Sequence, residues 1–111
     1  MIVEDSRLVA DKMKNLLKES LGVDQVDIAG NFQQGLRYVQ YLQPELVLLD
    51  IQLPDGNGLE LLRIINKDYP DIRVIVVSNH SSDNYRAMAM SLGANHFFDK
   101  SNEFEKIPYY V

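Results

Sequence analysis

The sequence contains no cysteine, only two histidines and no apolar run longer than four residues. The lack of cysteine excludes disulfide bonds and thiolate chemistry, and it is compatible with the cytosol. Four apolar residues are far too few to cross a bilayer, and the first residues carry no basic segment that would open a secretory signal. We therefore expect a soluble, cytoplasmic protein that does not bind membranes.

Positive charge is also scarce: 11 Lys and Arg residues stand against 16 Asp and Glu residues, for a net charge of -5. Affinity for nucleic acid comes largely from Lys and Arg side chains that neutralise phosphates, so we expect no direct nucleic acid binding by this segment. With 111 residues, 46% of them apolar, the chain has room for one globular domain. Residues 1–111 are accordingly predicted to be a single domain.

Short apolar runs alternate with segments of helical periodicity. The runs predict strands at residues 2–3, 26–29, 46–49, 74–77 and 96–98, and the periodic segments predict helices at about residues 8–21, 32–42, 59–69 and 85–92. This alternation, with two wholly apolar strands, predicts an α/β fold with a doubly wound, five-stranded parallel sheet. The segment Gly56–Gly58 is interpreted as a turn before the third helix.

The C-terminal tail departs from this regularity. Phe104 and Ile107 have helical spacing, but Pro108 is poorly tolerated inside a helix, so the tail predicts a short or incomplete fifth helix. We expect such a tail to leave apolar sheet surface exposed and to favour a homodimer.

Asp50 directly follows the apolar run Leu46–Leu49, and proline and glycine follow within a few residues. A carboxylate at the end of a buried strand is costly unless it caps the next element or takes part in chemistry. Because ligands bind beyond the carboxyl ends of strands in open α/β sheets, the other strand ends are of interest too. They carry Glu4 and Asp5, then Ser78, then Asp99 and Lys100.

Three carboxylates in one crevice would repel each other and therefore require a cation. With no cysteine and few histidines, the ligand set favours Mg²⁺, ahead of Mn²⁺ or Ca²⁺. Because Mg²⁺ keeps coordination places for phosphate oxygens, a phosphoryl group is the implied guest. Lys100 and Ser78 can neutralise its oxygens, and Asp50 can carry it as an acyl phosphate.

Four motifs, "IVEDS", "LVLLDIQLPDGNG", "VIVVSNHS" and "GANHFFDKS", follow one another in this order. With them, nearly the whole chain resembles the CheY-like response-regulator receiver domain of two-component signalling. The resemblance implies a flavodoxin-like sheet with strand order 2-1-3-4-5. It also implies that residues 1–111 are a receiver domain without an output domain.

The resemblance further implies a phospho-accepting switch. Asp50 would take a phosphoryl group from a partner sensor histidine kinase or phosphotransfer protein. Asp5, Asp50 and the backbone carbonyl of Gln52 would bind Mg²⁺, and Glu4 would act through a water molecule. The output domain or output protein is unknown.

Other positions acquire roles through the same resemblance. Ser78 and Lys100 would hold the phosphoryl oxygens, and Ser78 and Phe97 would form a switch that alters the surface around the fourth helix and fifth strand. Phe97 stands where many members have tyrosine. The positions that tune the reaction are occupied by Gln52, Asn79 and His80.

One backbone feature stays open at this point. Ser101 follows Lys100 where the family usually has proline. A non-proline cis bond costs about 3 kcal/mol, so the sequence does not decide between a cis and a trans Lys100–Ser101 bond.

Alternative functions remain. A degenerate receiver used only for protein docking is disfavoured by the intact acids, hydroxyl and lysine, although Asn79 replaces the usual small residue. A haloacid-dehalogenase-like phosphatase with an aspartyl nucleophile requires a second acid where Gln52 stands, and a flavodoxin-like cofactor site would be repelled by Glu4 and Asp5. We therefore expect no turnover enzyme for external substrates. Taken singly, each candidate also has a purely structural interpretation, such as a helix cap, a core ring or, for His80 and His96, a surface position.

Overall fold

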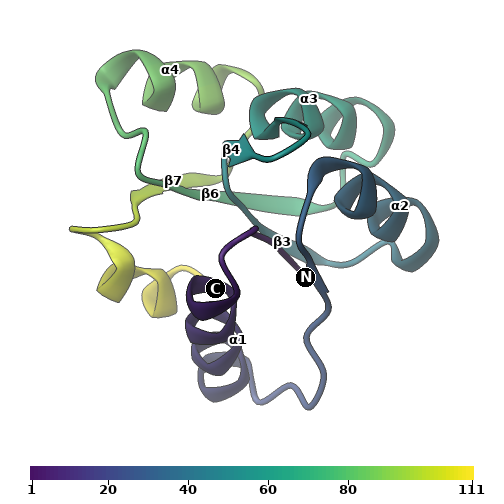
Figure 1. The fold of residues 1–111 in the computed structure, drawn as a ribbon, viewed down its shortest axis with the longest axis vertical. Coiled ribbons are helices and arrows are strands. Elements are labelled where there is room, and N and C mark those ends of the chain that lie inside the picture. The colour runs from purple at the N-terminus through teal and green to yellow at the C-terminus, as the bar shows by residue number, and fades with distance from the viewer.

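A computed structural model describes all residues from 1 to 111, and its centre is a five-stranded parallel sheet. The strand order is β2-β1-β3-β6-β7, which is the predicted 2-1-3-4-5 order when only the strands of this sheet are numbered (Figure 1). The strands are β1 Ile2–Val3, β2 Ile28–Ala29, β3 Leu46–Leu49, β6 Arg73–Ser78 and β7 His96–Asp99.

Helices cover both faces of the sheet, as predicted. The four α-helices and one 3₁₀ helix are α1 Arg7–Leu21, α2 Phe32–Leu42, α3 Gly58–Asp68, α4 Asp83–Ser91 and η1 Phe104–Tyr109. Figure 1 shows α1 and the C-terminal segment on one face, and α2, α3 and α4 on the other. The fifth helix is the short 3₁₀ helix η1, with Pro108 inside it. None of the helices is long and apolar enough to cross a membrane.

Local side chains explain where the helices begin and end. The residue before each α-helix is a Ser or Asn whose side chain accepts a hydrogen bond from a backbone N–H of the first turn, which supplies an otherwise missing partner. These caps are Ser6, Asn31, Asn57 and Ser82. Gly22 ends α1 with a φ of 66°, a left-handed conformation that glycine adopts without a steric penalty.

The segment after β3 is a small hairpin rather than a simple turn. β4 Gln52–Leu53 pairs antiparallel with β5 Gly56–Asn57. Gly58 then begins α3 directly against the backbone that follows β3. A Cβ atom at Gly58 would lie 2.0 Å from the carbonyl oxygen of Asp50, so this position requires glycine for close approach.

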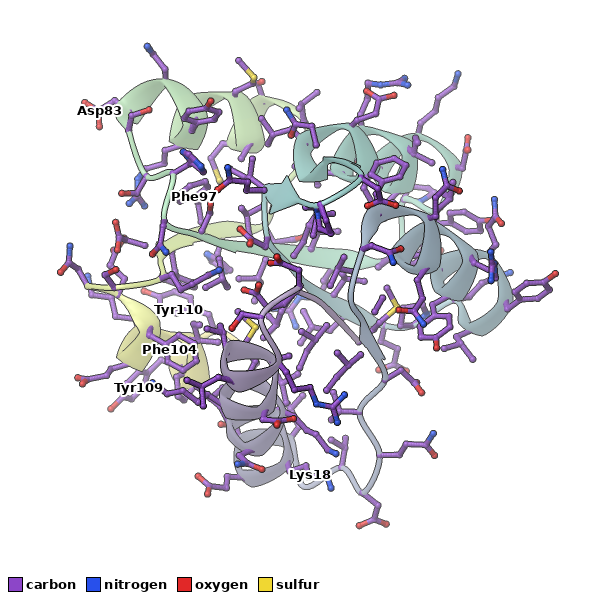
Figure 2. The ribbon with its side chains drawn as sticks, viewed as in Figure 1. Lys18, Asp83, Phe97, Phe104, Tyr109 and Tyr110 are labelled. Carbon is purple, nitrogen blue, oxygen red and sulfur yellow. The ribbon has the colours of Figure 1, made fainter.

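Two apolar layers pack against the sheet. One contains 16 buried residues between the sheet and α2, α3 and α4, and the other contains 9 between the sheet and α1 and η1. The expectation that a short fifth helix exposes the sheet is wrong. Ile107 of η1 is fully buried, Phe98 of β7 is 5% exposed, and the Tyr110 ring packs 5.2 Å from the Phe98 ring. A 3₁₀ helix of about two turns and the following tyrosine therefore cover this edge of the sheet (Figure 2).

Candidate functional site

The carboxyl ends of the strands form a crevice of about 550 Å³. Strand register explains the convergence, because Val3 of β1 pairs with Leu49 of β3, which brings the residues that follow them side by side. Eight of the nine residues expected at the site line this crevice: Glu4, Asp5, Asp50, Gln52, Ser78, Asn79, His80 and Lys100.

Buried charge is concentrated at the floor of the crevice. Glu4 is 2% exposed and Asp50 is 5% exposed. The ammonium group of Lys100 donates one hydrogen bond to Glu4 Oε1 and another, of 3.2 Å, to Asp50 Oδ2. Lys100 therefore bridges the acids that follow β1 and β3, 96 and 50 residues away in the chain.

Burial and hydrogen bonding act in opposite directions on these groups. Burial raises the pKa of the Glu4 carboxyl above its ordinary value, and the hydrogen bonds from Lys100 and from the Ser6 N–H only partly offset it. Burial alone would lower the pKa of Lys100, but the hydrogen bond to Glu4 and the charges of Asp50 and Glu4 prevail and raise it. Lys100 consequently remains a cation.

One ammonium group does not balance the negative charge of the crevice. Ligand oxygens of Glu4, Asp5 and Asp50 all lie within 4.8 Å of one another. Asp5 is exposed at the mouth, whereas the other two acids are buried. Three carboxylate oxygens at this spacing, with no sulfur or imidazole among them, fit a hard divalent cation such as Mg²⁺.

Ser78 is fully buried at the end of β6. Its hydroxyl oxygen accepts a 3.1 Å hydrogen bond from the His80 N–H, and its backbone carbonyl accepts a 3.0 Å bond from the Lys100 N–H. The second bond ties the loop after β6 to the end of β7. No peptide bond is cis, so the Lys100–Ser101 bond, left open by the sequence, is trans.

The three tuning candidates form the rim. The His80 ring Nε2 lies 2.8 Å from Gln52 Oε1, and the His80 ring packs 5.4 Å from the Tyr85 ring. Asn79 Oδ1 accepts a 3.1 Å hydrogen bond from the Ser101 hydroxyl. His80 thus links the hairpin after β3 to α4, a contact that the sequence does not predict.

Phe97 is the one expected residue that lies outside the crevice. It is 5% exposed, and Figure 2 shows it between β7 and α4. The guanidinium carbon of Arg86, on α4, lies 4.8 Å from the centre of its ring, and Arg86 Nη1 donates a 2.9 Å hydrogen bond to the Phe97 carbonyl. Arg86 Nη2 also binds Glu103 Oε1 at 2.7 Å.

Arg86 and Glu103 are absent from the candidates that the sequence suggested. They lie 17 residues apart in the chain, and taken singly each has the character of an ordinary charged surface residue. A weak signal was available, because Glu103 follows Asp99 by four residues across the "DKSNE" turn, a spacing close to that of a capping box.

Comparison with known proteins agrees with this geometry. The family model of the response regulator receiver domain matches residues 1–111. The chain belongs to this family. Receiver domains are signalling modules of two-component systems rather than turnover enzymes.

Two curated relatives are longer regulatory proteins. This chain is 31% identical over 106 residues to the luminescence regulatory protein LuxO of Vibrio campbellii, covering 96% of this chain and 23% of LuxO. It is 31% identical over 99 residues to the DNA-binding transcriptional activator DevR/DosR of Mycobacterium tuberculosis, covering 89% of this chain and 46% of that protein. The chain therefore spans less than half the length of these curated relatives.

Solved structures share the fold. A CheY-like receiver domain protein from Methanospirillum hungatei superposes with a TM-score of 0.81 at 28% identity, covering 97% of this chain and 88% of that one. The signal receiver domain of a response regulator from Colwellia psychrerythraea gives a TM-score of 0.88 at 23% identity, covering 97% and 89% of the two chains.

Proposed function

We propose that this receiver domain is a phospho-accepting signalling switch with Asp50 as the acceptor. The observation that carries the proposal is the buried Asp50 carboxylate, which lies among two further acids and one lysine ammonium group. This arrangement suits a phosphoryl group, because a divalent cation and an ammonium group can together neutralise its oxygens.

The proposed reaction is a transfer between two carriers. An Asp50 carboxylate oxygen attacks the phosphorus atom, a P–O bond of Asp50 forms, and the bond from phosphorus to the donor breaks with its electron pair left on the donor. The donor is the phosphorylated imidazole of a sensor histidine kinase or phosphotransfer protein. Its departing nitrogen keeps the electron pair and takes up a proton from solvent, so the imidazole leaves neutral. Lys100 would shift from Asp50 to a phosphoryl oxygen, and the Ser78 hydroxyl would donate to another.

Mg²⁺ fits the acids of the crevice, with Mn²⁺ as a second candidate. Asp5, Asp50 and the carbonyl of Gln52 would bind it, and Glu4 would act through a water molecule. When bound, the ion would neutralise charge that develops on the transferred group. Asp5 lies at the exposed mouth of the crevice, where a hydrated ion can enter.

The proposed readout involves Ser78 and Phe97. A hydroxyl drawn towards the phosphoryl group would move the loop between β6 and α4, and the Phe97 ring under α4 would respond. The surface around α4 and β7 would then differ between the two states. Gln52, Asn79 and His80 at the rim would tune how water and donors reach Asp50, and hence the lifetime of the acyl phosphate.

The remaining parts of the proposal concern partners and organisation. Residues 1–111 would act as the receiver unit in the cytoplasm, with the output in another domain or protein and with a homodimer as one candidate assembly. This net-negative segment would not bind DNA itself, although DevR/DosR is a DNA-binding activator. The acyl phosphate would be lost by hydrolysis, without turnover of external substrates.

The test uses a small acyl phosphate as donor, because it needs no cognate kinase. With Mg²⁺, intact mass should rise by one phosphoryl group, and Asp50→Asn or a chelator should abolish the increase. Asp55→Asn is the matched control, since Asp55 is an exposed acid in the next loop whose carboxylate binds the Phe32 and Gln33 N–H groups. Uptake that persists in Asp50→Asn would overturn the assignment, and repeated turnover of phosphate esters would favour a phosphatase.

A further inference from the structure

Asp99, the last residue of β7, lies directly before Lys100, and both oxygens of its carboxylate accept hydrogen bonds. Oδ1 accepts hydrogen bonds from the N–H groups of Ser101, at 2.8 Å, and Asn102, at 3.0 Å. Oδ2 accepts a hydrogen bond from the hydroxyl of Ser81, which belongs to the loop between β6 and α4. One carboxylate therefore joins the turn after Lys100 to the loop after Ser78.

Further bonds join the same two segments on either side of Asp99. The Lys100 N–H donates to the Ser78 carbonyl, and the Ser101 hydroxyl donates to Asn79 Oδ1. Hydrogen bonds thus fix the N–H group of Lys100 and also the residue that follows it, Ser101. The Lys100 side chain extends from this point into the crevice to reach Asp50.

The main chain of Asp99 is fixed as well. Its N–H donates a 3.0 Å hydrogen bond to Glu103 Oε1, and its carbonyl accepts a 2.8 Å bond from the Glu103 N–H. This reciprocal pairing resembles a capping box, in which two residues satisfy each other's backbone groups. Hydrogen bonds from Ser81, then from the Asn102 and Ser101 N–H groups, lower the pKa of the Asp99 carboxyl, so these donors favour its charged form.

The backbone after Lys100 is not fixed by its own covalent structure. Position 101 is a serine, which does not restrict φ as a proline ring does. Lysine is a flexible side chain with several rotatable bonds, so the position of its ammonium group depends on where the backbone starts. The hydrogen bonds of Asp99 restrain that starting point.

We propose that Asp99 is a positioning residue for Lys100, whose ammonium group it aims at the phosphoryl site by tying the turn after β7 to the loop after β6. This proposal rests on the proposed function of Asp50. Asp99 itself touches neither Asp50 nor the transferred group. Its effect passes through the placement of Lys100.

The kinetic test compares phosphoryl uptake from a small acyl phosphate in two variants. Asp99→Ala removes all three acceptor bonds and should lower the rate at saturating donor about tenfold, since misplacing a charge by a fraction of an ångström weakens transition-state stabilisation. Asp99→Asn keeps a carbonyl oxygen for the two backbone N–H groups, and its amide nitrogen can donate to the Ser81 hydroxyl, so this variant should recover most of the rate. Asp55→Ala removes two comparable bonds to backbone N–H groups away from Lys100 and should leave the rate near that of the wild type.

A double-mutant cycle separates positioning from a general loss of structure. In a Lys100→Ala background, Asp99→Ala should cause no further loss of rate, because the group that it positions is gone. Additive losses in the cycle, or a single Asp99→Ala variant as fast as the wild type, would overturn the positioning role. Urea unfolding should show that every variant compared is folded.

A readout that needs no phosphoryl transfer keeps the two proposals distinguishable. The ¹⁵N signal of the Lys100 ammonium group, assigned by its absence in Lys100→Arg, should move towards that of a free lysine in Asp99→Ala and stay in place in Asp55→Ala. If the wild type takes up no phosphoryl group, the proposed function fails. An unmoved Lys100 signal in Asp99→Ala would overturn the positioning role alone.

Discussion

Two pairs of acidic residues lie near Lys100 in this receiver domain, and their surroundings differ. In the crevice, Glu4 and Asp50 are buried and share one ammonium group. In the turn between β7 and η1, Asp99 and Glu103 lie closer to solvent and accept hydrogen bonds from hydroxyl, backbone and guanidinium donors. Glu4 and Asp50 therefore share a single cation, whereas Glu103 alone pairs with two, Arg86 and Lys106.

The pKa shifts follow this difference. Burial raises the pKa of Glu4, whereas Arg86 and the Asp99 N–H lower the pKa of Glu103 to about 2. An acid whose pKa is lowered in the fold stabilises the folded state when it is ionised. An acid whose pKa is raised destabilises the folded state when it is ionised, and such a cost is typical of functional sites, here one that fits a cation.

The largest contrast should come from removing the cation of each group in metal-free buffer. Lys100→Ala leaves two buried carboxylates without a positively charged partner and should lower the free energy of unfolding by about 3 kcal/mol. Arg86→Ala, at a side chain that is 37% exposed, should cost about 1 kcal/mol. Urea unfolding measures both, and Mg²⁺ should restore part of the stability of Lys100→Ala. Equal losses in the two variants would contradict the contrast.

Neutralising one acid in each group should change stability with opposite signs. Asp50→Asn removes repulsion from Glu4 and Asp5 and should raise the free energy of unfolding by about 1 to 2 kcal/mol. Glu103→Gln weakens the ion pair with Arg86 and should lower it by about 1 kcal/mol. Chemical unfolding at pH 7 without Mg²⁺ provides the comparison, and a destabilised Asp50→Asn would show that repulsion in the crevice is negligible.

The smallest effect should appear in the pH dependence of stability. The pKa of Glu103 is about 2 in the fold and 4.5 in its absence, so its contribution is complete above pH 4.5 and is lost as the pH falls towards 2. The raised pKa of Glu4 acts the other way, since stability falls as the pH rises above 4.5 and this acid ionises. Glu103 should account for less than about 1 kcal/mol because it is partly exposed to solvent.

Two variants show which residue causes the loss of stability below pH 4.5 and which causes the loss above it. Glu103→Gln should flatten the acidic limb of the unfolding free energy, and Glu4→Gln should flatten the limb above pH 4.5. An acidic limb that is unchanged in Glu103→Gln would locate the loss of stability in other carboxylates.

The crevice could be predicted because its residues share a simple feature of the chain. Asp50 and Ser78 end wholly apolar runs, and such runs indicate strands that are buried on both faces. Parallel strands then bring their carboxyl ends to one edge of the sheet. The order of the strands did not follow from periodicity, since apolar runs do not specify neighbours, and it required the resemblance to a known family.

The second acidic group could not be predicted for a physical reason. Arg86, Asp99 and Glu103 come from a helix, a strand and the tail, and surface polar residues carry no periodic signal that would pair them. The hairpin of β4 and β5 was not predicted from the sequence for another reason. Its strands have two residues each, which is too short to show an alternation of apolar and polar residues. Similarly, β2 begins at Ile28 rather than Val26, where a polar neighbour already weakened the strand pattern.

Gly58 has a consequence for how this chain tolerates change. Its sequence context, between asparagine and leucine in a polar turn, suggests a position that could be varied freely. A Cβ atom at this position would instead collide with the main chain of Asp50 and Ile51, so any larger residue would displace the backbone that carries the Asp50 carboxylate. In a saturation library selected separately for folding and for signalling, position 58 should be among the sites where the second selection is far stricter than the first.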